Sequence, residues 1–143
     1  MQAVQYLNFN HTNEVLDFYQ TYLDANIITK IMGDDAMFKD SPEEYRMPEE
    51  IAKNFVMNSQ FEILGQPFMA SDTWEQRPVN NEGAIVAFVA DIEQDAEKLL
   101  TFFNKASQAP GCHITMPLGK TEWAKQYGMF IDPFGVTWMI NIY

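Results

Sequence analysis

Few side chains in this sequence could carry out covalent chemistry. The chain has one cysteine, Cys112, which directly precedes His113, and its only other histidine is His11. A cysteine nucleophile needs a base within hydrogen-bond reach. The stretch around Cys112 and His113 predicts a strand, and neighbouring residues of a strand point to opposite faces. We therefore interpret Cys112 as a structural residue and His11 as a solvated loop residue.

Glu62 is the carboxylate that strand alternation places best for acid–base chemistry. It shares one face of a predicted strand with Asn58 and Gln60. A carboxylate can act as a general base where it reaches a substrate proton. Glu62 also lies beside a predicted turn, Gly65-Gln66-Pro67, where carboxylates are usually solvated. It is therefore a weak candidate for a catalytic residue.

The elements that must position these residues fall into two similar halves. The first half predicts a strand (2–9), an amphipathic helix (11–25) with Thr12 and Asn13 as capping candidates, a second strand (26–32) and a hairpin (54–72). The second half predicts a strand (83–91), a helix that begins at Asp91 with Ile92 facing inward, and three shorter strands (112–118, 127–132 and 135–143). A duplicated unit explains both halves, so we predict an α+β fold. It would consist of two tandem βαβββ units in one domain over residues 1–143, with unit one over 1–75 and unit two over 82–143.

The segment 33–50, between the second strand and the hairpin, is strongly acidic, with seven Asp or Glu residues against Lys39 and Arg46. We expect a solvated loop with one or two helical turns, which begin at Ser41-Pro42 and at Pro48. The alternative interpretation is a flap over a pocket.

Composition and charge restrict the classes of partner. Of the 143 residues, 47% are hydrophobic, which is typical of a chain with a packed core, and the formal net charge is -11. Only nine Lys and Arg residues are available to neutralise phosphates, so we expect no binding to nucleic acid and none to membranes. A single cysteine allows no intramolecular disulfide, and we expect a cytoplasmic protein.

Three stretches of sequence, together with the paired βαβββ order, resemble one known superfamily. They are YLNFNHTNEVLDFYQTYL (6–23), FEILGQPFMASD (61–72) and ITMPLGKTEWAKQYGMFIDPFGVTWMIN (114–141). They resemble the vicinal oxygen chelate superfamily of glyoxalase I, bleomycin-resistance proteins and extradiol dioxygenases, and within it the PhnB-like branch of 3-demethylubiquinone-9 3-methyltransferase-like domains. The resemblance implies a curved mixed sheet around a concave small-molecule pocket, with the helices on the convex side.

The resemblance also implies the four positions at which metal enzymes of the superfamily hold a divalent ion. Val4, Asn58, Ala84 and Met139 occupy these positions here. Divalent metals need several carboxylate, imidazole or thiolate ligands, and these four side chains offer at most one amide oxygen. We therefore expect no metal site and no other cofactor.

Alternation from these four positions predicts the residues that face the pocket. The predicted pocket residues are Tyr6, Asn8, Asn58, Gln60, Phe88, Met139 and Asn141, and the resemblance adds Trp123 as a lid or wall. The residues of the opposite faces, expected to pack on the helices, include Leu7, Phe61, Ile85, Val89 and Trp138. The predicted lining has no Lys or Arg, so it suits a neutral, aromatic or quinone-like ligand better than an anion.

Three functions fit these expectations. The first is a metal-free protein that binds a small molecule for sequestration or sensing. The second is an enzyme that uses Glu62, Asn58 or Tyr6 for metal-independent acid–base chemistry. The third is a structural dimer whose interface fills the groove. We expect a homodimer, because members of the superfamily commonly dimerise.

Overall fold

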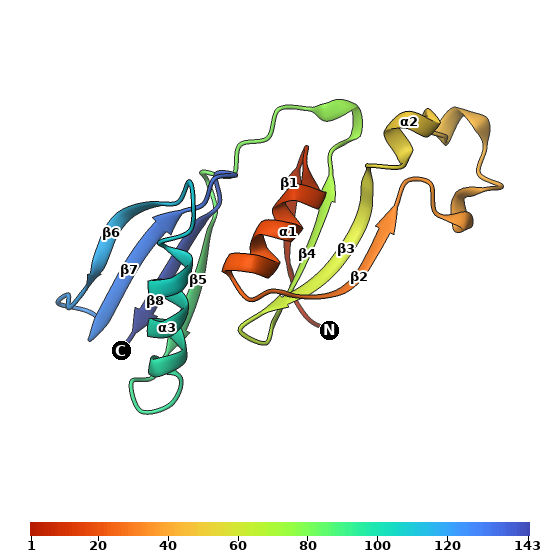
Figure 1. Cartoon of the computed structure of the whole chain (residues 1–143). Coiled ribbons are helices and arrows are strands. Elements are labelled where there is room, and N and C mark those ends of the chain that lie inside the picture. The colour runs from red at the N-terminus through yellow and green to blue at the C-terminus, as the bar shows by residue number, and fades with distance from the viewer. The chain divides into compact units, whose positions relative to one another are not determined.

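The computed structural model describes all 143 residues and divides into two compact units, Met1–Val79 and Asn80–Tyr143 (Figure 1). The elements of unit 1 are β1 (Gln5–Phe9), α1 (Thr12–Tyr22), β2 (Asn26–Met32), α2 (Glu49–Ala52), β3 (Val56–Ile63) and β4 (Gln66–Asp72). Those of unit 2 are β5 (Ile85–Ala90), α3 (Ala96–Ala106), β6 (His113–Gly119), β7 (Gln126–Ile131) and β8 (Thr137–Ile142). Short 3-10 helices span Ala36–Phe38, Glu43–Tyr45 and Trp74–Gln76.

Both sheets have the same strand order and the same mixture of strand directions. The order is β1-β4-β3-β2 in unit 1 and β5-β8-β7-β6 in unit 2. In each sheet the first strand of the unit pairs in parallel with the last, and the other pairs are antiparallel. The predicted α+β fold of two tandem βαβββ units is therefore confirmed.

The core of unit 1 lies between α1 and one face of its sheet. Tyr19 of α1 is fully buried, and its ring centroid lies 6.4 Å from that of Phe9 and 6.1 Å from that of Phe61. Phe61 stacks on Phe68 of the neighbouring strand at 5.5 Å. These rings lie on one face of the strands, so strand alternation directs them all toward the helix.

The N-terminus of α1 is capped by a residue of β4. Asp72 accepts hydrogen bonds from the Thr12 backbone N–H at 2.8 Å and from the Thr12 hydroxyl at 2.7 Å, and its other oxygen accepts one from the Val56 N–H at 2.8 Å. The prediction of Thr12 and Asn13 as capping residues was wrong, because the helix already begins at Thr12 and its first N–H is satisfied from a distant strand. Because Asp72 is distant from Thr12 in the sequence, the residues around the start of the helix do not indicate this cap.

The core of unit 2 is built around Trp138, which is fully buried and lies 6.3 Å from Phe102 of α3 between ring centroids. Phe103, also of α3, packs edge-on against Phe130 of β7 at 5.6 Å. The absence of a side chain at Gly128 allows this close approach, since a Cβ there would lie 2.8 Å from ring carbons of Phe103. The aromatic residues of α3 therefore fix the helix on this face of the sheet.

The structure corrects the prediction for β5. Phe88 was expected to face the pocket, but it is only 8% exposed and packs against Phe102 at 5.3 Å and Trp138 at 6.1 Å, on the helix side of the sheet. Ile85 and Val89, expected to pack on the helix, are 45% and 58% exposed. The strand reads IVAFVA and is apolar at every position, so its alternation could not indicate which face is buried.

Helix α3 begins at Ala96 and not at Asp91 as predicted. The Asp91 carboxylate accepts a hydrogen bond from the Glu93 N–H at 2.8 Å, which stabilises a turn ahead of the helix. Ile92, expected to face inward, is exposed as a result.

The segment between β2 and β3 contains only short helices. A 3-10 turn follows Pro42 and α2 follows Pro48, as the two prolines predicted. No helix anywhere in the chain combines the length and the apolar character that a membrane span requires.

Candidate functional site

The helix-free face of the unit 1 sheet carries polar side chains from three strands. Tyr6 and Asn8 come from β1, and Asn58, Gln60 and Glu62 come from β3. The register places Tyr6 and Gln60 on either side of Met69 in β4. The prediction from strand alternation that these residues share one face of the sheet agrees with the structure.

A chain of hydrogen bonds links this face across its strands. The Tyr6 hydroxyl donates to the Ser71 hydroxyl at 2.9 Å, and the Asn58 amide donates to the Tyr6 oxygen at 3.3 Å. Ser71 was not among the predicted pocket residues; it lies two residues after Met69 in β4 and therefore shares its face of the sheet. Glu62 is half-buried near the turn between β3 and β4, away from this chain of bonds.

The helix-free face of the unit 2 sheet is apolar and aromatic. Met139 lies opposite Met129 in the register of β8 and β7, and Asn141 lies opposite Tyr127. The Tyr127 hydroxyl donates to the Met129 sulfur at 3.2 Å. Trp123, which precedes β7 and is 62% exposed, packs edge-on against Tyr127 at 5.6 Å between ring centroids. The structure therefore brings three predicted pocket residues of unit 2 together, while Phe88 lies on the other face of the sheet.

Asn141 contains the one buried side-chain polar atom that lacks a hydrogen bond. Its Oδ1 is shielded from solvent and accepts from no donor of the chain. A buried carbonyl oxygen without a donor costs about 1–3 kcal/mol, so such an atom in a native structure calls for an explanation. A ligand that donates a hydrogen bond to Asn141 would satisfy it.

The residues present do not fit a divalent metal of the superfamily type. Val4 and Ala84 lie just before their strands, while Asn58 and Met139 lie on helix-free faces. Nowhere in the chain do three or more His, Cys, Asp or Glu side chains gather in a group that could hold a metal ion. An amide and a thioether do not replace the carboxylate and imidazole ligands that such an ion needs.

Cys112 and His113 do not form a reactive pair in this structure. Burial, with a smaller contribution from the negative charge of Asp132, raises the pKa of the Cys112 thiol to about 11. The thiolate is the nucleophilic form, and it is scarce at neutral pH when the pKa is this high.

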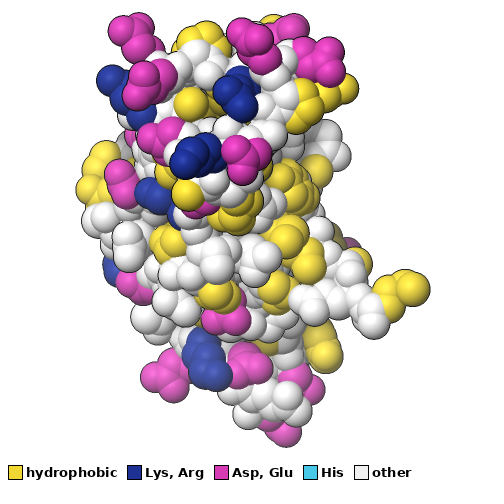
Figure 2. Space-filling view, turned by 90° about the vertical axis from the view of Figure 1, so that its right-hand side faces the viewer, with side chains coloured by type: hydrophobic (Ala, Val, Ile, Leu, Met, Phe, Trp, Pro, Cys, Tyr) yellow, Lys and Arg dark blue, Asp and Glu magenta, His cyan; other side chains and the backbone are white.

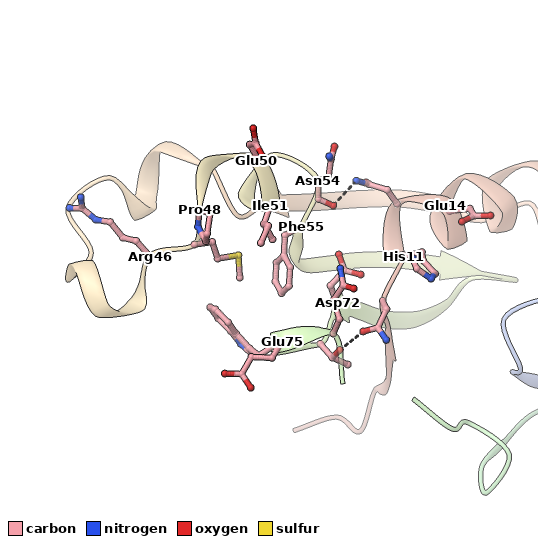
Figure 3. Close-up of a pocket in the computed structure, with 16 residues that line it drawn as sticks. His11, Glu14, Arg46, Pro48, Glu50, Ile51, Asn54, Phe55, Asp72 and Glu75 are labelled. Carbon is pink, nitrogen blue, oxygen red and sulfur yellow. Dashed lines mark hydrogen bonds between the residues drawn. The ribbon is translucent and has the colours of Figure 1, made fainter. Parts of the chain in front are cut away.

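A cavity of about 950 Å³ lies in unit 1, outside the helix-free face (Figure 3). It is open to solvent on one side, and three segments line it: the start of α1, the second half of the β2–β3 connection, and the residues that follow β4. Its lining residues are Asn10, His11, Asn13, Glu14, Arg46, Met47, Pro48, Glu50, Ile51, Asn54, Phe55, Asp72, Thr73, Trp74, Glu75 and Gln76. None of the eight predicted pocket residues is among them. Residues 46–50 of the acidic segment, for which a flap over a pocket was the alternative interpretation, supply part of its wall.

Comparisons with known proteins agree with this fold over nearly the whole chain. The family model described as Glyoxalase/Bleomycin resistance protein/Dioxygenase superfamily matches residues 3–140. Protein YjdN of Escherichia coli (strain K12) is 28% identical over 145 residues, which cover 99% of this chain and 95% of YjdN.

Two solved structures extend the likeness to three dimensions. Protein PA1353 from Pseudomonas aeruginosa is 31% identical with a TM-score of 0.69, and the match covers 99% of this chain and 97% of PA1353. The PhnB protein from Bacillus cereus is 23% identical with a TM-score of 0.67, and the match covers 100% of both chains. The chain therefore belongs to the glyoxalase/bleomycin resistance protein/dioxygenase superfamily.

Proposed function

We propose that this chain is a metal-free binding protein for a neutral aromatic or quinone-like small molecule, which it sequesters or senses. The observation that carries the proposal is the buried Oδ1 of Asn141, which has no donor and lies opposite Tyr127 on the helix-free face of unit 2. A ligand hydroxyl or N–H would supply the missing hydrogen bond.

The surroundings of Asn141 favour an aromatic ring. Met139 and Met129 offer polarizable thioethers, and sulfur–aromatic contacts contribute about 0.3–1.5 kcal/mol each. Trp123 and Tyr127 add an edge-on aromatic pair beside them. An apolar lining with one convergent polar group is the usual character of a small-molecule site.

The strand residues of this face offer no positive charge to an anionic ligand. The strand residues that share the face with Asn141 include Ala87, Val89, Tyr127, Met129 and Met139, and none is Lys or Arg. A phosphate or carboxylate would lose its hydration here without gaining a cationic partner. A neutral phenol or hydroquinone meets the same face with a hydroxyl donor and no charge.

A thermal-shift comparison of three matched naphthalenes tests this function. 2-Naphthol carries the donor that Asn141 lacks, 2-methoxynaphthalene keeps the ring without the donor, and 2-naphthoate adds a negative charge. A ligand at about 100 times its Kd stabilises a protein by about 2.7 kcal/mol, so a binding ligand raises the melting temperature clearly. We expect the largest shift with 2-naphthol, a smaller one with 2-methoxynaphthalene, and none with 2-naphthoate.

The variant Asn141→Leu identifies the group responsible. It removes the carbonyl and should abolish the preference for 2-naphthol over its methyl ether. Thr101→Ala, an exposed residue of α3 on the other side of the sheet, is the matched control and should keep that preference. Equal shifts with 2-naphthol and 2-naphthoate, or no shift with any of the three compounds, would contradict the proposal.

A further inference from the structure

The cavity of unit 1 has features that the proposed function does not use. We propose that it is a separate binding site for an organic cation that carries a quaternary ammonium group next to an apolar body. The cavity has an exposed aromatic wall, more carboxylates than cationic side chains, and one arginine that donates to backbone carbonyls. These features do not involve the helix-free faces.

The first feature is an indole that the fold leaves open to the cavity. Trp74 is 49% exposed, and its ring packs on the buried Phe55 at 5.6 Å between centroids. Ile51, also exposed, and Met47 continue this apolar wall from the β2–β3 connection. Figure 3 shows Phe55 and Ile51 directed into the space between the segments. A cavity of about 950 Å³ with such a wall can enclose a ligand of drug-like size.

The second feature is the charge around this aromatic wall. Four carboxylates line the cavity, those of Glu14, Glu50, Asp72 and Glu75. Asp72 is buried, and its hydrogen bonds come from Thr12 and Val56, which are neutral donors. Figure 2 views the chain from the side of the β2–β3 connection and shows acidic, basic and hydrophobic side chains next to one another. The cavity therefore has a negative potential beside an aromatic face.

The third feature is that the cationic side chains at the cavity donate to neutral oxygens and not to the four carboxylates. Arg46 is the one Lys or Arg that lines the cavity, and its guanidinium donates to the Ser41 carbonyl at 2.7 Å and to the Lys39 carbonyl at 2.9 Å. In Figure 3 the guanidinium points away from Phe55. Lys30 contacts the lining residue Asn13 at 3.0 Å, through the amide and not through a carboxylate. The lining thus carries four carboxylates against one guanidinium, and no ion pair joins Arg46 to any of the four.

The backbone beside the indole is held in an uncommon conformation. Glu75 and Gln76 have φ angles of 59° and 48°, in the left-handed region that side chains other than glycine rarely adopt. Such residues concentrate at ligand clamps, where the surrounding fold maintains them. Here the two residues follow Trp74 directly, and Glu75 lies at the rim of the cavity.

These features select a quaternary ammonium over other ligands. An ammonium over the face of a tryptophan is attracted by the ring quadrupole, and a quaternary group has weak hydration and no need for hydrogen-bond acceptors. Carboxylates at the rim add long-range attraction. Phe55, Ile51 and Met47 accommodate the apolar part of the molecule. An anion would be repelled, and a neutral molecule would gain only the apolar contacts.

Isothermal calorimetry with two probes of equal shape tests the site. Phenyltrimethylammonium and tert-butylbenzene differ in charge and hardly at all in size. We expect the cation to bind at least tenfold more tightly than the neutral compound, and its affinity to fall as salt is added. Equal affinity for both probes, or no binding of the cation at millimolar concentration, overturns the proposal.

Variants separate this site from the one proposed on unit 2. Trp74→Ala should weaken binding of phenyltrimethylammonium about tenfold, and Trp74→Phe should restore part of it. Glu75→Gln should weaken it about two- to threefold, while Glu93→Gln, an exposed carboxylate of unit 2, should leave it unchanged. Asn141→Leu should not affect the cation, and Trp74→Ala should not affect 2-naphthol. Loss of cation binding in Asn141→Leu would contradict two independent sites.

Discussion

The two units share one strand order but differ in what joins their second and third strands. In unit 1 this connection runs over residues 33–55 and contains α2 and two 3-10 turns, whereas in unit 2 it runs only over residues 120–125. The long connection of unit 1 supplies the wall of the cavity shown in Figure 3. The repeated sheet thus provides the scaffold, and an insertion in one copy provides a concave site.

The helix-free faces of the two sheets also differ, in the chemistry of their side chains. That of unit 1 carries the linked polar groups of Tyr6, Ser71 and Asn58, whereas that of unit 2 carries methionine and aromatic side chains around Asn141. Both sheets bury the opposite face under a helix. The duplicated architecture therefore constrains the residues beneath the helix and leaves the other face free to diverge in chemistry.

The prediction with the largest expected effect tests whether the first strand of each unit buries the face that is turned to the helix. Phe9 of β1 and Phe88 of β5 both face their helix, and Phe9 is only 4% exposed. Phe9→Ala and Phe88→Ala should each lower the free energy of unfolding by about 3–5 kcal/mol, because each leaves a cavity in a packed core. Urea denaturation measures the loss. Val89→Ala, at the neighbouring exposed position of β5, should cost less than about 1 kcal/mol, and the opposite order would contradict the observed face of β5.

The same two phenylalanines show how far the sequence predicts this fold. In β1 polar and apolar residues alternate, and the prediction of Tyr6 and Asn8 on one face with Leu7 on the other agrees with the structure. In β5 every residue is apolar. The sequence therefore predicted a strand but could not indicate which of its faces is turned to the helix. Orientation there depends on the aromatic residues of α3, which are distant in sequence.

The cavity was beyond sequence reasoning for a similar reason. Its parts come from three segments that alternation and helical spacing do not connect, and Asp72 joins two of them by bonds to Thr12 and Val56. The sequence predicted the turns after Pro42 and Pro48 but not that the second of them would face Trp74. Local signals predict elements, whereas contacts between loops depend on the tertiary structure.

A second prediction compares the buried carboxylates of the two units. Asp72→Ala removes three hydrogen bonds that frame the cavity, and Asp132→Ala removes bonds to the Phe134 and Val136 N–H groups and the Trp138 indole in unit 2. Each should lower the free energy of unfolding by about 2–4 kcal/mol, because buried donors lose their acceptor. Only Asp72→Ala should also weaken phenyltrimethylammonium binding. Equal weakening by Asp132→Ala would mean that general instability, and not the frame of the cavity, causes the loss.

A third prediction tests the long connection itself. A Cβ at Gly33 would lie 2.9 Å from the Ala52 carbonyl oxygen and 3.3 Å from the Met47 sulfur. Gly33→Ala should therefore cost about 1–3 kcal/mol by overpacking and shift the cavity wall, which calorimetry with phenyltrimethylammonium would detect. Gly83→Ala is the matched control in unit 2, because a Cβ there meets nothing within 4 Å. Its stability should change by less than about 1 kcal/mol, and an equal loss in both variants would argue against a steric cause.

The prediction with the smallest expected effect uses the thiol of Cys112 to probe unit 2 alone, since unit 1 has no cysteine. Its pKa is raised to about 11 from 9.0, first by burial and second by Asp132. Alkylation by iodoacetamide should therefore keep rising with pH up to about 11 in the folded protein, whereas in urea it should level off near 9. Between these two values the unfolded chain releases the thiol proton and the folded chain retains it, so the thiol lowers stability as pH rises through this window. If the folded protein also levelled off near pH 9, the environment of Cys112 would not favour the neutral thiol, and the packing of β6 against the turn at Asp132 would need revision.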